Sequence, residues 1–188
     1  MPVNVELGLN TKSARKVREI ATEVGALLFG DFTLTSGKKS SYYFDGKKLT
    51  LSPQGAYWVG KAIFEELAKM SVDAVGGVAV GGYPIATAVA VVSYLEGKPI
   101  PSFMVREVAK EHGTKKQIEG HLKGGFRVAI VEDVVTTGGS VFKTIDAVEA
   151  ANCKVVKVIA ILDRHEGGSD MLKEKGYDFT AILNIYPS

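Results

Sequence analysis

The stretch from Val131 to Ser140, VEDVVTTGGS, constrains the fold most, because its physical character changes three times within ten residues. The apolar run before it, Phe126–Val131, is typical of a buried strand. The acidic pair Glu132 and Asp133 follows, then a loop of threonine, glycine and serine, and then a helical pattern. This layout suits a sugar phosphate, because backbone N–H groups and a helix N-terminus attract the phosphate while carboxylates accept sugar hydroxyls.

The acidic pair places a condition on this interpretation. Neighbouring residues of an extended strand point to opposite faces, so Glu132 and Asp133 can serve one ligand only if the strand ends by about Val131. We assume that the strand ends there. The alternative is an ordinary strand, tight turn and helix with an exposed acidic pair, but the clustering of acids, hydroxyls and glycines favours a site.

The composition is that of an ordinary soluble globule, with 46% apolar residues, 23% charged residues and a net charge of +2. We expect one domain over residues 1–188, with no nucleic-acid or membrane partner. Cys153 is the only cysteine, which excludes an internal disulfide and favours a buried structural thiol. The N-terminus has no signal-peptide pattern, and Ile85–Val92 is too short to span a membrane, so we expect a cytoplasmic location.

Apolar runs alternate with helical patterns along the chain, which predicts an α/β fold: a mostly parallel central sheet flanked by helices. Ligands of such folds bind at the carboxyl ends of the strands. The expected strands are residues 74–80, 100–105, 126–131, 155–162 and 179–183, and the expected helices are residues 11–28, 53–69, 85–95, 140–151 and 168–175. The helix 85–95 is apolar nearly all round and should be buried against the sheet.

Two segments lie outside this alternation. Phe32–Asp45 alternates β-forming residues around a Ser-Gly-Lys turn and predicts a hairpin, which would form a small N-terminal hood over about residues 30–50. Its three consecutive aromatics, Tyr42 to Phe44, either all belong to the core or partly cover a ligand. Residues 106–125 are rich in lysine and glycine and match no element, which suits a mobile lid over an anion or an unstructured basic loop.

Two further positions could belong to a site. Arg164 follows the strand that ends at Leu162, so it should lie at the same edge as the acidic pair. It could serve as a fork for a carboxylate or base carbonyls, or simply pair with Glu166 or Asp163. Gly81 and Gly82 would allow close approach of the backbone to a ligand, or be turn residues.

These stretches resemble the type I phosphoribosyltransferases, and together they resemble the orotate phosphoribosyltransferase branch. VEDVVTTGGS is similar to the phosphoribosyl-diphosphate signature, which by itself specifies only the superfamily. Four other stretches match in order along nearly the whole chain: FTLTSGKKSSYYFD, GGVAVGGYPIATAVA, VREVAKEHG and ILDRHEG. The resemblance implies the type I phosphoribosyltransferase fold, with the hood at the N-terminus and the lid at about residues 106–125.

The resemblance also implies residue roles. Glu132 and Asp133 would hold the ribose hydroxyls, and the 5′-phosphate would lie in the loop of Thr136, Thr137, Gly138, Gly139 and Ser140. Backbone around Ala79, Val80 and Gly81 would face the diphosphate. Tyr43 and Phe44 would lie near orotate, and Arg164 would recognise the pyrimidine.

The implied reaction is transfer of the 5-phosphoribosyl group from 5-phosphoribosyl-1-diphosphate to N1 of orotate, a step of pyrimidine biosynthesis. Lys110, His112 and Asp133 would be catalytic, with Arg106 also on the diphosphate. Mg²⁺ is the implied cofactor, held mainly by substrate and water. The implied assembly is a homodimer whose lid acts on the neighbouring subunit. We expect the chain to carry only this transfer step, without a decarboxylase.

The sequence departs from the family pattern at three places. Glu107 stands where lysine is common, Thr35 replaces a lysine of the hairpin, and Val80-Gly81 replaces a tyrosine-lysine pair. Lys38, Lys39, Lys115 or Lys116 are available to compensate. The alternatives are a phosphoribosyltransferase for another nucleobase and a non-catalytic module that senses 5-phosphoribosyl-1-diphosphate.

Overall fold

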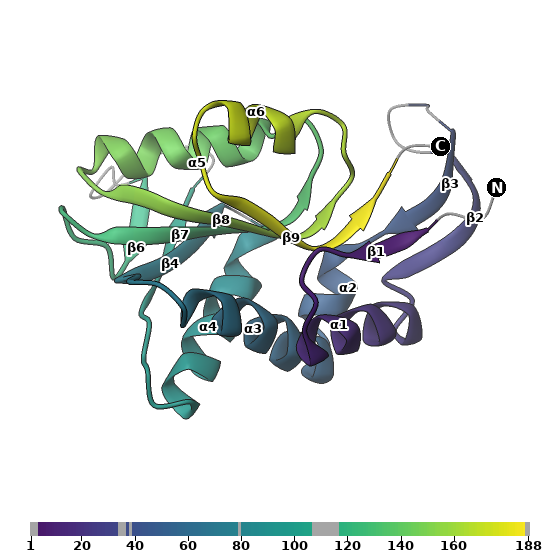
Figure 1. The fold of residues 1–188 in the computed structure, drawn as a ribbon, viewed down its shortest axis with the longest axis horizontal. Helices are drawn as coiled ribbons and strands as arrows, with labels where there is room; N and C mark the ends of the chain where they lie inside the picture. Colours follow the sequence, from purple (N-terminus) through teal and green to yellow (C-terminus); the bar gives the residue numbers. More distant parts are fainter. Residues whose placement is uncertain (1–3, 34–36, 38, 79, 107–116, 187–188) are drawn as a thin grey trace.

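The computed structural model describes residues 4–33, 37, 39–78, 80–106 and 117–186. A seven-stranded sheet, in the order β1-β9-β8-β7-β4-β5-β6, runs through the molecule, and β2 and β3 form a separate hairpin (Figure 1). The strands are β1 (Val5–Leu7), β2 (Leu27–Thr33), β3 (Lys39–Phe44), β4 (Ala74–Val78), β5 (Ser102–Val105), β6 (Ile118–Gly120), β7 (Arg127–Val135), β8 (Lys154–Asp163) and β9 (Phe179–Ile185). The helices are α1 (Lys12–Glu23), α2 (Gly46–Thr50), α3 (Pro53–Leu67), α4 (Gly82–Leu95), α5 (Gly139–Ala150) and α6 (Gly168–Glu174).

The central strands β9, β8, β7, β4 and β5 are parallel, and antiparallel β1 and β6 form the two edges. Helices α5 and α6 lie on one face of the sheet, and α1, α3 and α4 lie on the other (Figure 1). Alternate residues of the strands feed two cores. On β7, Ile130 packs in the core beneath α5, whereas Val131 packs in the core that includes α3 and α4. The predicted mostly parallel α/β fold is confirmed.

Two predicted helices differ in detail from the structure. The first ends at Glu23 instead of Leu28, because Gly25 has a φ of +66° and turns the chain, so that Leu27 enters β2. The helix expected at 85–95 begins earlier, at Gly82. Its outer face is not buried, since Tyr94 and Leu95 are more than two thirds exposed. The expected burial against the sheet is confirmed for the opposite face of this helix, where Ile85, Val89 and Val92 are buried.

Strand β7 does not end at Val131, as we assumed, but continues to Val135. Val134 pairs with Leu162 of β8, and Val135 pairs with Asp163. The strand persists because these two valines still have apolar surroundings: Val135 is buried, and Val134 packs against the core on the α3 side. The acidic pair consequently lies within a strand, not after it.

The hood hairpin is confirmed, although it begins at Leu27, and its strands pair across residues 27–33 and 39–44. The prediction that residues 106–125 form no helix or strand was wrong, because residues 118–120 form β6, which pairs antiparallel with β5. A three-residue strand is too short to show alternation in the sequence. Only residues 107–116 of the predicted lid lie outside the described part.

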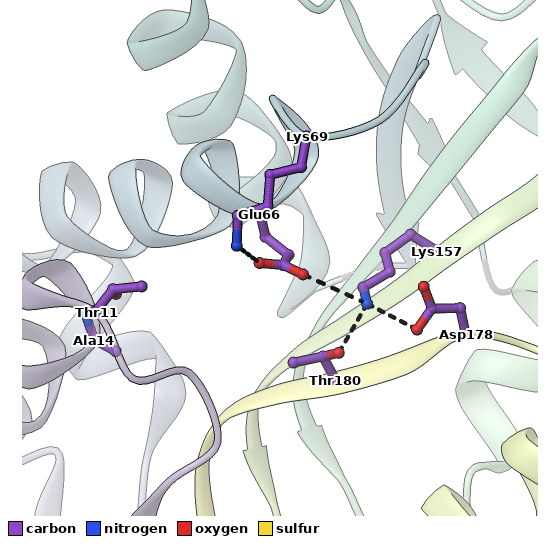
Figure 2. Close-up of polar contacts among 7 residues, drawn as sticks. All are labelled: Thr11, Ala14, Glu66, Lys69, Lys157, Asp178 and Thr180. Atoms are coloured by element: carbon purple, nitrogen blue, oxygen red, sulfur yellow. Dashed lines mark hydrogen bonds and ion pairs between the residues drawn. The ribbon is translucent and has the colours of Figure 1, made fainter.

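At the amino end of β8, away from the carboxyl edge, Lys157 is buried with 3% of its surface exposed. Its Nζ lies 2.8 Å from Asp178 Oδ1 and 2.8 Å from Thr180 Oγ1, both near the start of β9 (Figure 2). Glu66 of α3 is 3.8 Å away and also pairs with Lys69. This group joins α3 to the sheet.

Within the described residues, no helix is long and apolar enough to cross a membrane.

Candidate active site

The loop between β7 and α5 has the geometry of an anion cradle. Gly138 has a φ of +82°, a conformation that favours glycine, and its backbone caps α5. No side chain caps the first amides of α5, and its first turn contains no acid. These amides and the positive end of the helix dipole therefore remain available to a phosphate. Thr137, Gly139 and Ser140 are exposed around them.

Glu132 is turned toward this loop. It is 5% exposed, its Oε2 accepts the hydroxyl of Ser140 at 2.9 Å, and its Oε1 accepts the amide of Asp133 at 3.2 Å. Burial, and then the neighbouring negative charge of Asp133, raise the pKa of Glu132 from 4.5 to about 8. The carboxyl group therefore tends to retain a proton at neutral pH when no ligand is present.

Asp133 faces other neighbours. A Cβ built on Gly46, the first residue of α2, would lie 2.7 Å from Asp133 Cβ, and one built on Gly81 would lie 2.4 Å from its carboxyl carbon. One carboxylate oxygen accepts the amide of Val134 at 2.8 Å. The side chain thus occupies a slot between α2 and the start of α4 that only glycines leave open. The two acids are held by different elements, as expected from their place in a strand.

The β8–α6 loop places Arg164 at the same edge. Its Nε donates to the hydroxyl of Tyr42 at 2.8 Å, and its guanidinium carbon lies 5.2 Å from the centre of that ring. Glu166 Oε1 is 3.1 Å from the same Nε, so the ion pair we considered as an alternative is present. Tyr42 comes from the hood, so two segments far apart in the sequence meet here.

The same loop also touches the phosphate cradle. Gly168 donates its amide to the carbonyl of Thr136 at 2.9 Å. A Cβ on Gly168 would lie 2.6 Å from that carbonyl oxygen and 2.6 Å from the amide nitrogen of Gly138. The segment that carries Arg164 and the loop predicted to hold the 5′-phosphate therefore pack backbone against backbone.

The remaining predicted site residues do not form one cluster in the described part of the structure. Tyr43 is 41% exposed and lies beside Phe32 on the outer side of the hairpin, whereas Phe44 is partly buried against the core. Val80 is 69% exposed, and Gly81 precedes α4. Arg106 pairs with Glu119 of β6 at 2.9 Å. Ala79, Lys110 and His112 lie outside the described residues.

Arg106 also lines a cavity of about 600 Å³. The wall of this cavity continues over Val105 and Gln117 to Ser140 and Lys143 of α5. The guanidinium of Arg106, the ammonium of Lys143 and the hydroxyl of Ser140 therefore line one cavity beside the loop between β7 and α5. The cavity lies between the predicted diphosphate contact at Arg106 and the predicted phosphate contact at Ser140.

Reasoning from the sequence missed Tyr42, Gly46 and His165. Tyr42 was considered only as one of three aromatics, although strict alternation would have separated it from Tyr43. His165 has a φ of +50°, and its ring stacks on Tyr186 at 4.1 Å and lies 3.1 Å from Asn184 Oδ1. No pattern in the sequence indicates these packing contacts.

Among the described residues, no group of three or more histidine, cysteine, aspartate or glutamate side chains is arranged to hold a metal ion. The carboxylates of β7 at this edge are Glu132 and Asp133, whereas Asp163 and Glu166 of the neighbouring β8–α6 segment bond to His165 and Arg164. Mg²⁺ commonly keeps waters and substrate phosphates and uses one or two carboxylates. The donor set at this edge is therefore compatible with a Mg²⁺ ion carried largely by a phosphorylated substrate.

Comparison with known proteins agrees with this geometry. Residues 53–180 match the model of the phosphoribosyl transferase domain. An orotate phosphoribosyltransferase from Nostoc sp. is 46% identical over 83% of this chain and 76% of its own length. The orotate phosphoribosyltransferase of Mycobacterium tuberculosis, solved with Fe(III) dicitrate, superimposes with a TM-score of 0.80 at 32% identity, over 92% of this chain and 96% of that one.

A second structure of the M. tuberculosis enzyme contains 5-phospho-α-D-ribosyl 1-diphosphate. It superimposes with a TM-score of 0.75 at 29% identity, over 93% of this chain and 96% of that chain. The family match covers more than half of the chain, and the M. tuberculosis enzyme shares the fold over 92% of it. The chain belongs to the phosphoribosyltransferase family, within its orotate phosphoribosyltransferase branch.

Proposed function

We propose that this protein transfers the 5-phosphoribosyl group from 5-phosphoribosyl-1-diphosphate to N1 of orotate. The products are orotidine 5′-monophosphate and diphosphate, so the enzyme takes part in pyrimidine biosynthesis. The observation that carries the proposal is the contact between Gly168 and Thr136, because it holds an arginine loop suited to a base against a loop suited to a phosphate. A substrate with both groups would span these two loops.

The 5′-phosphate would lie on the open amides at the start of α5, beside the hydroxyls of Thr136, Thr137 and Ser140. Asp133, and Glu132 once it is ionised, would accept the ribose hydroxyls. Arg164 would take the carboxylate or a carbonyl of orotate, with Tyr43 and Phe44 nearby. The backbone of Val80 and Gly81 would border the diphosphate.

In the reaction, N1 of orotate forms a bond to C1 of the ribose while the bond from C1 to the diphosphate oxygen breaks. The electron pair of that bond leaves with the diphosphate, and the proton on N1 is released. The transition state has oxocarbenium character, as in glycoside cleavage. Arg106, together with Lys110 and His112, would stabilise the charge that develops on the leaving group, and each such preorganised donor is typically worth about 3 kcal/mol.

Mg²⁺ fits this arrangement as a cofactor. It would be held chiefly by the substrate and water, with Asp133 available as a carboxylate ligand from the chain. When bound, it neutralises charge on the leaving diphosphate. The residues of the chain orient the two substrates around it.

The active form would be a homodimer in which the lid of one subunit acts on the site of the other. The outer face of α4 supports a dimer, because Val91, Tyr94 and Leu95 expose apolar surface of the kind that subunit interfaces cover. Mixing Lys110→Ala chains with Asp133→Ala chains tests the shared lid. Hybrid dimers would have one intact site in two, so random mixing should restore about a quarter of wild-type activity. No recovery after demonstrated subunit exchange would contradict a lid that acts in trans.

The function itself is tested by the ultraviolet absorbance of orotate. The protein, with 5-phosphoribosyl-1-diphosphate and Mg²⁺, should consume orotate and should not consume uracil or adenine at a comparable rate. Omitting Mg²⁺ and omitting the diphosphate substrate are the controls. Persistence of the orotate signal with well-folded protein would refute the proposal, and consumption of another base would redirect it.

A further inference from the structure

The contact between Tyr42 and Arg164 joins parts of the chain that are 122 positions apart. Tyr42 is buried in β3, with 9% of its surface exposed, and its ring packs in the core that includes α3 and α4. Its hydroxyl accepts the Nε–H of Arg164 at 2.8 Å, and the guanidinium lies 5.2 Å from the ring centre. A rigid core residue thus fixes the end of a long side chain.

The backbone beneath Arg164 is also fixed. Its neighbour His165 donates its amide to Asp163 Oδ1 at 2.8 Å, and the His165 ring stacks on Tyr186 and lies 3.1 Å from Asn184 Oδ1. The amide of Arg164 donates to the carbonyl of Val135 at 3.0 Å. Neither the backbone nor the side chain of Arg164 therefore needs to be ordered by a ligand.

The hydrogen bond that holds Arg164 uses only Nε. Glu166 approaches the same nitrogen at 3.1 Å, and among the described residues neither terminal amino group of Arg164 donates a hydrogen bond. The two terminal groups form the half of the guanidinium fork that binds a carboxylate or paired carbonyl oxygens in two parallel bonds. Within the described part of the chain, the contact with Tyr42 thus leaves both terminal amino groups of Arg164 without a hydrogen-bond partner while it restricts the orientation of the side chain.

We propose that Tyr42 is a positioning residue for Arg164, and that through it the hood sets the preference for a nucleobase that carries a carboxylate. This inference rests on the proposed function. A long arginine side chain loses considerable rotamer freedom when it binds, and a prior contact that already restricts it lowers that cost. The contribution of Tyr42 to binding should appear in the affinity for the base and not in the affinity for the phosphoribosyl substrate.

The protonation state of Tyr42 suits this role. Burial raises the pKa of the Tyr42 phenol, and the positive charge of Arg164 opposes that shift only in part. The phenol therefore stays protonated around neutral pH. Its oxygen can therefore accept the Nε–H of Arg164 as a neutral hydroxyl.

The experiment is Tyr42→Phe, which removes one hydroxyl and keeps the buried ring. We expect KM for orotate to rise about tenfold, because a hydrogen bond to a charged group is lost. KM for 5-phosphoribosyl-1-diphosphate and kcat should stay within about twofold of wild type, since the transition-state contacts to the diphosphate are unchanged. The ratio of kcat/KM for orotate to that for uracil should fall by a similar factor.

Tyr177→Phe is the matched control, because the Tyr177 hydroxyl donates to the exposed Glu149 at 3.1 Å, outside the site. It should leave both KM values unchanged. An unchanged KM for orotate in Tyr42→Phe would overturn the inference, as would equal increases in both KM values, which indicate a general loss of structure. If wild-type protein consumes no orotate, the proposed function fails instead, so the two failures are distinguishable.

Discussion

The buried carboxyl group of Glu132 makes the stability of the ligand-free protein depend on pH. Its pKa is 4.5 in an unfolded chain and about 8 in the folded protein, because burial and the charge of Asp133 oppose ionisation. Between these two values the unfolded chain releases a proton that the folded protein retains, so folding stability falls as pH rises. Each pKa unit corresponds to about 1.4 kcal/mol, so the loss above about pH 8 is on the order of 5 kcal/mol.

Glu132→Gln isolates this effect, because glutamine has the shape of the protonated acid: its carbonyl oxygen can accept the amide of Asp133 while its NH2 group donates to Ser140 Oγ. At about pH 5 the wild type has lost little stability, so the free energies of unfolding of the two proteins should differ by about 1 kcal/mol or less because of this group. At about pH 9 the variant should gain on the order of 4 kcal/mol relative to wild type. Titratable groups distant from Glu132 are the same in both proteins, so their contributions cancel.

The assay is urea unfolding of both proteins, without phosphate or nucleotide, at about pH 5, 7 and 9. The midpoint difference between variant and wild type should increase steadily with pH at an unchanged denaturant slope. A difference that is independent of pH would refute the reasoning, because it would mean that Glu132 is already ionised in the folded protein. A difference that grows below about pH 5 would contradict the sign of the shift.

Three further substitutions test the packing around the site and beneath the sheet. Gly168→Ala places a Cβ 2.6 Å from backbone of the phosphate loop, so KM for 5-phosphoribosyl-1-diphosphate should rise about tenfold or more in steady-state kinetics, and an unchanged KM would contradict the contact. Gly46→Ala should displace the side chain of Asp133, which lowers kcat/KM for 5-phosphoribosyl-1-diphosphate and lowers the free energy of unfolding in urea by about 1–3 kcal/mol. Gly124→Ala is the control: its Cβ would lie 3.6 Å from the nearest atom, so neither quantity should change. Lys157→Met should lower the free energy of unfolding in urea by about 1 kcal/mol or less, because the side chain of Asp178 is 57% exposed and stays solvated. A decrease of about 3–5 kcal/mol would show instead that the buried ion pair is essential for stability.

The order of the main elements could be predicted because the central strands are buried on both faces. The middle of β8, Val158–Leu162, is entirely apolar and buried, so its pattern is unambiguous. The phosphate loop was equally clear, since Gly138 requires a positive φ and the helix follows at once. Both signals are local, which is why the sequence alone reveals them.

The end of β7 could not be predicted, because it depends on its neighbours. Glu132 and Asp133 suggest a strand end by composition, yet pairing with β8 and the apolar surroundings of Val134 and Val135 extend the strand. The strand β6 was missed for a related reason: its three residues gain stability only from pairing with β5. Tertiary context outweighed local pattern in both cases.

The contacts that shape the site are likewise non-local. Tyr42 reaches Arg164 across 122 positions, and Gly46 is required by a carboxylate on β7, far along the chain. Sequence spacing cannot reveal such pairs, because nothing in the local pattern of either residue specifies the other. Candidate functional residues were therefore easier to propose from the sequence than the residues that hold them in place.

The extension of β7 changes how the acidic pair should be understood. Both carboxylates were expected to hold the ribose in the same way, but a strand directs them to different elements. Asp133 lies in a slot beside Gly81, next to the predicted diphosphate backbone, whereas Glu132 is buried and bonded to Ser140 of the phosphate cradle. We infer that Asp133 is poised to meet the sugar without rearrangement. Glu132 is buried with a raised pKa, so accepting sugar hydroxyls as a carboxylate would require it to release its proton, and the arrival of a sugar phosphate would then be coupled to proton release from this one carboxyl group.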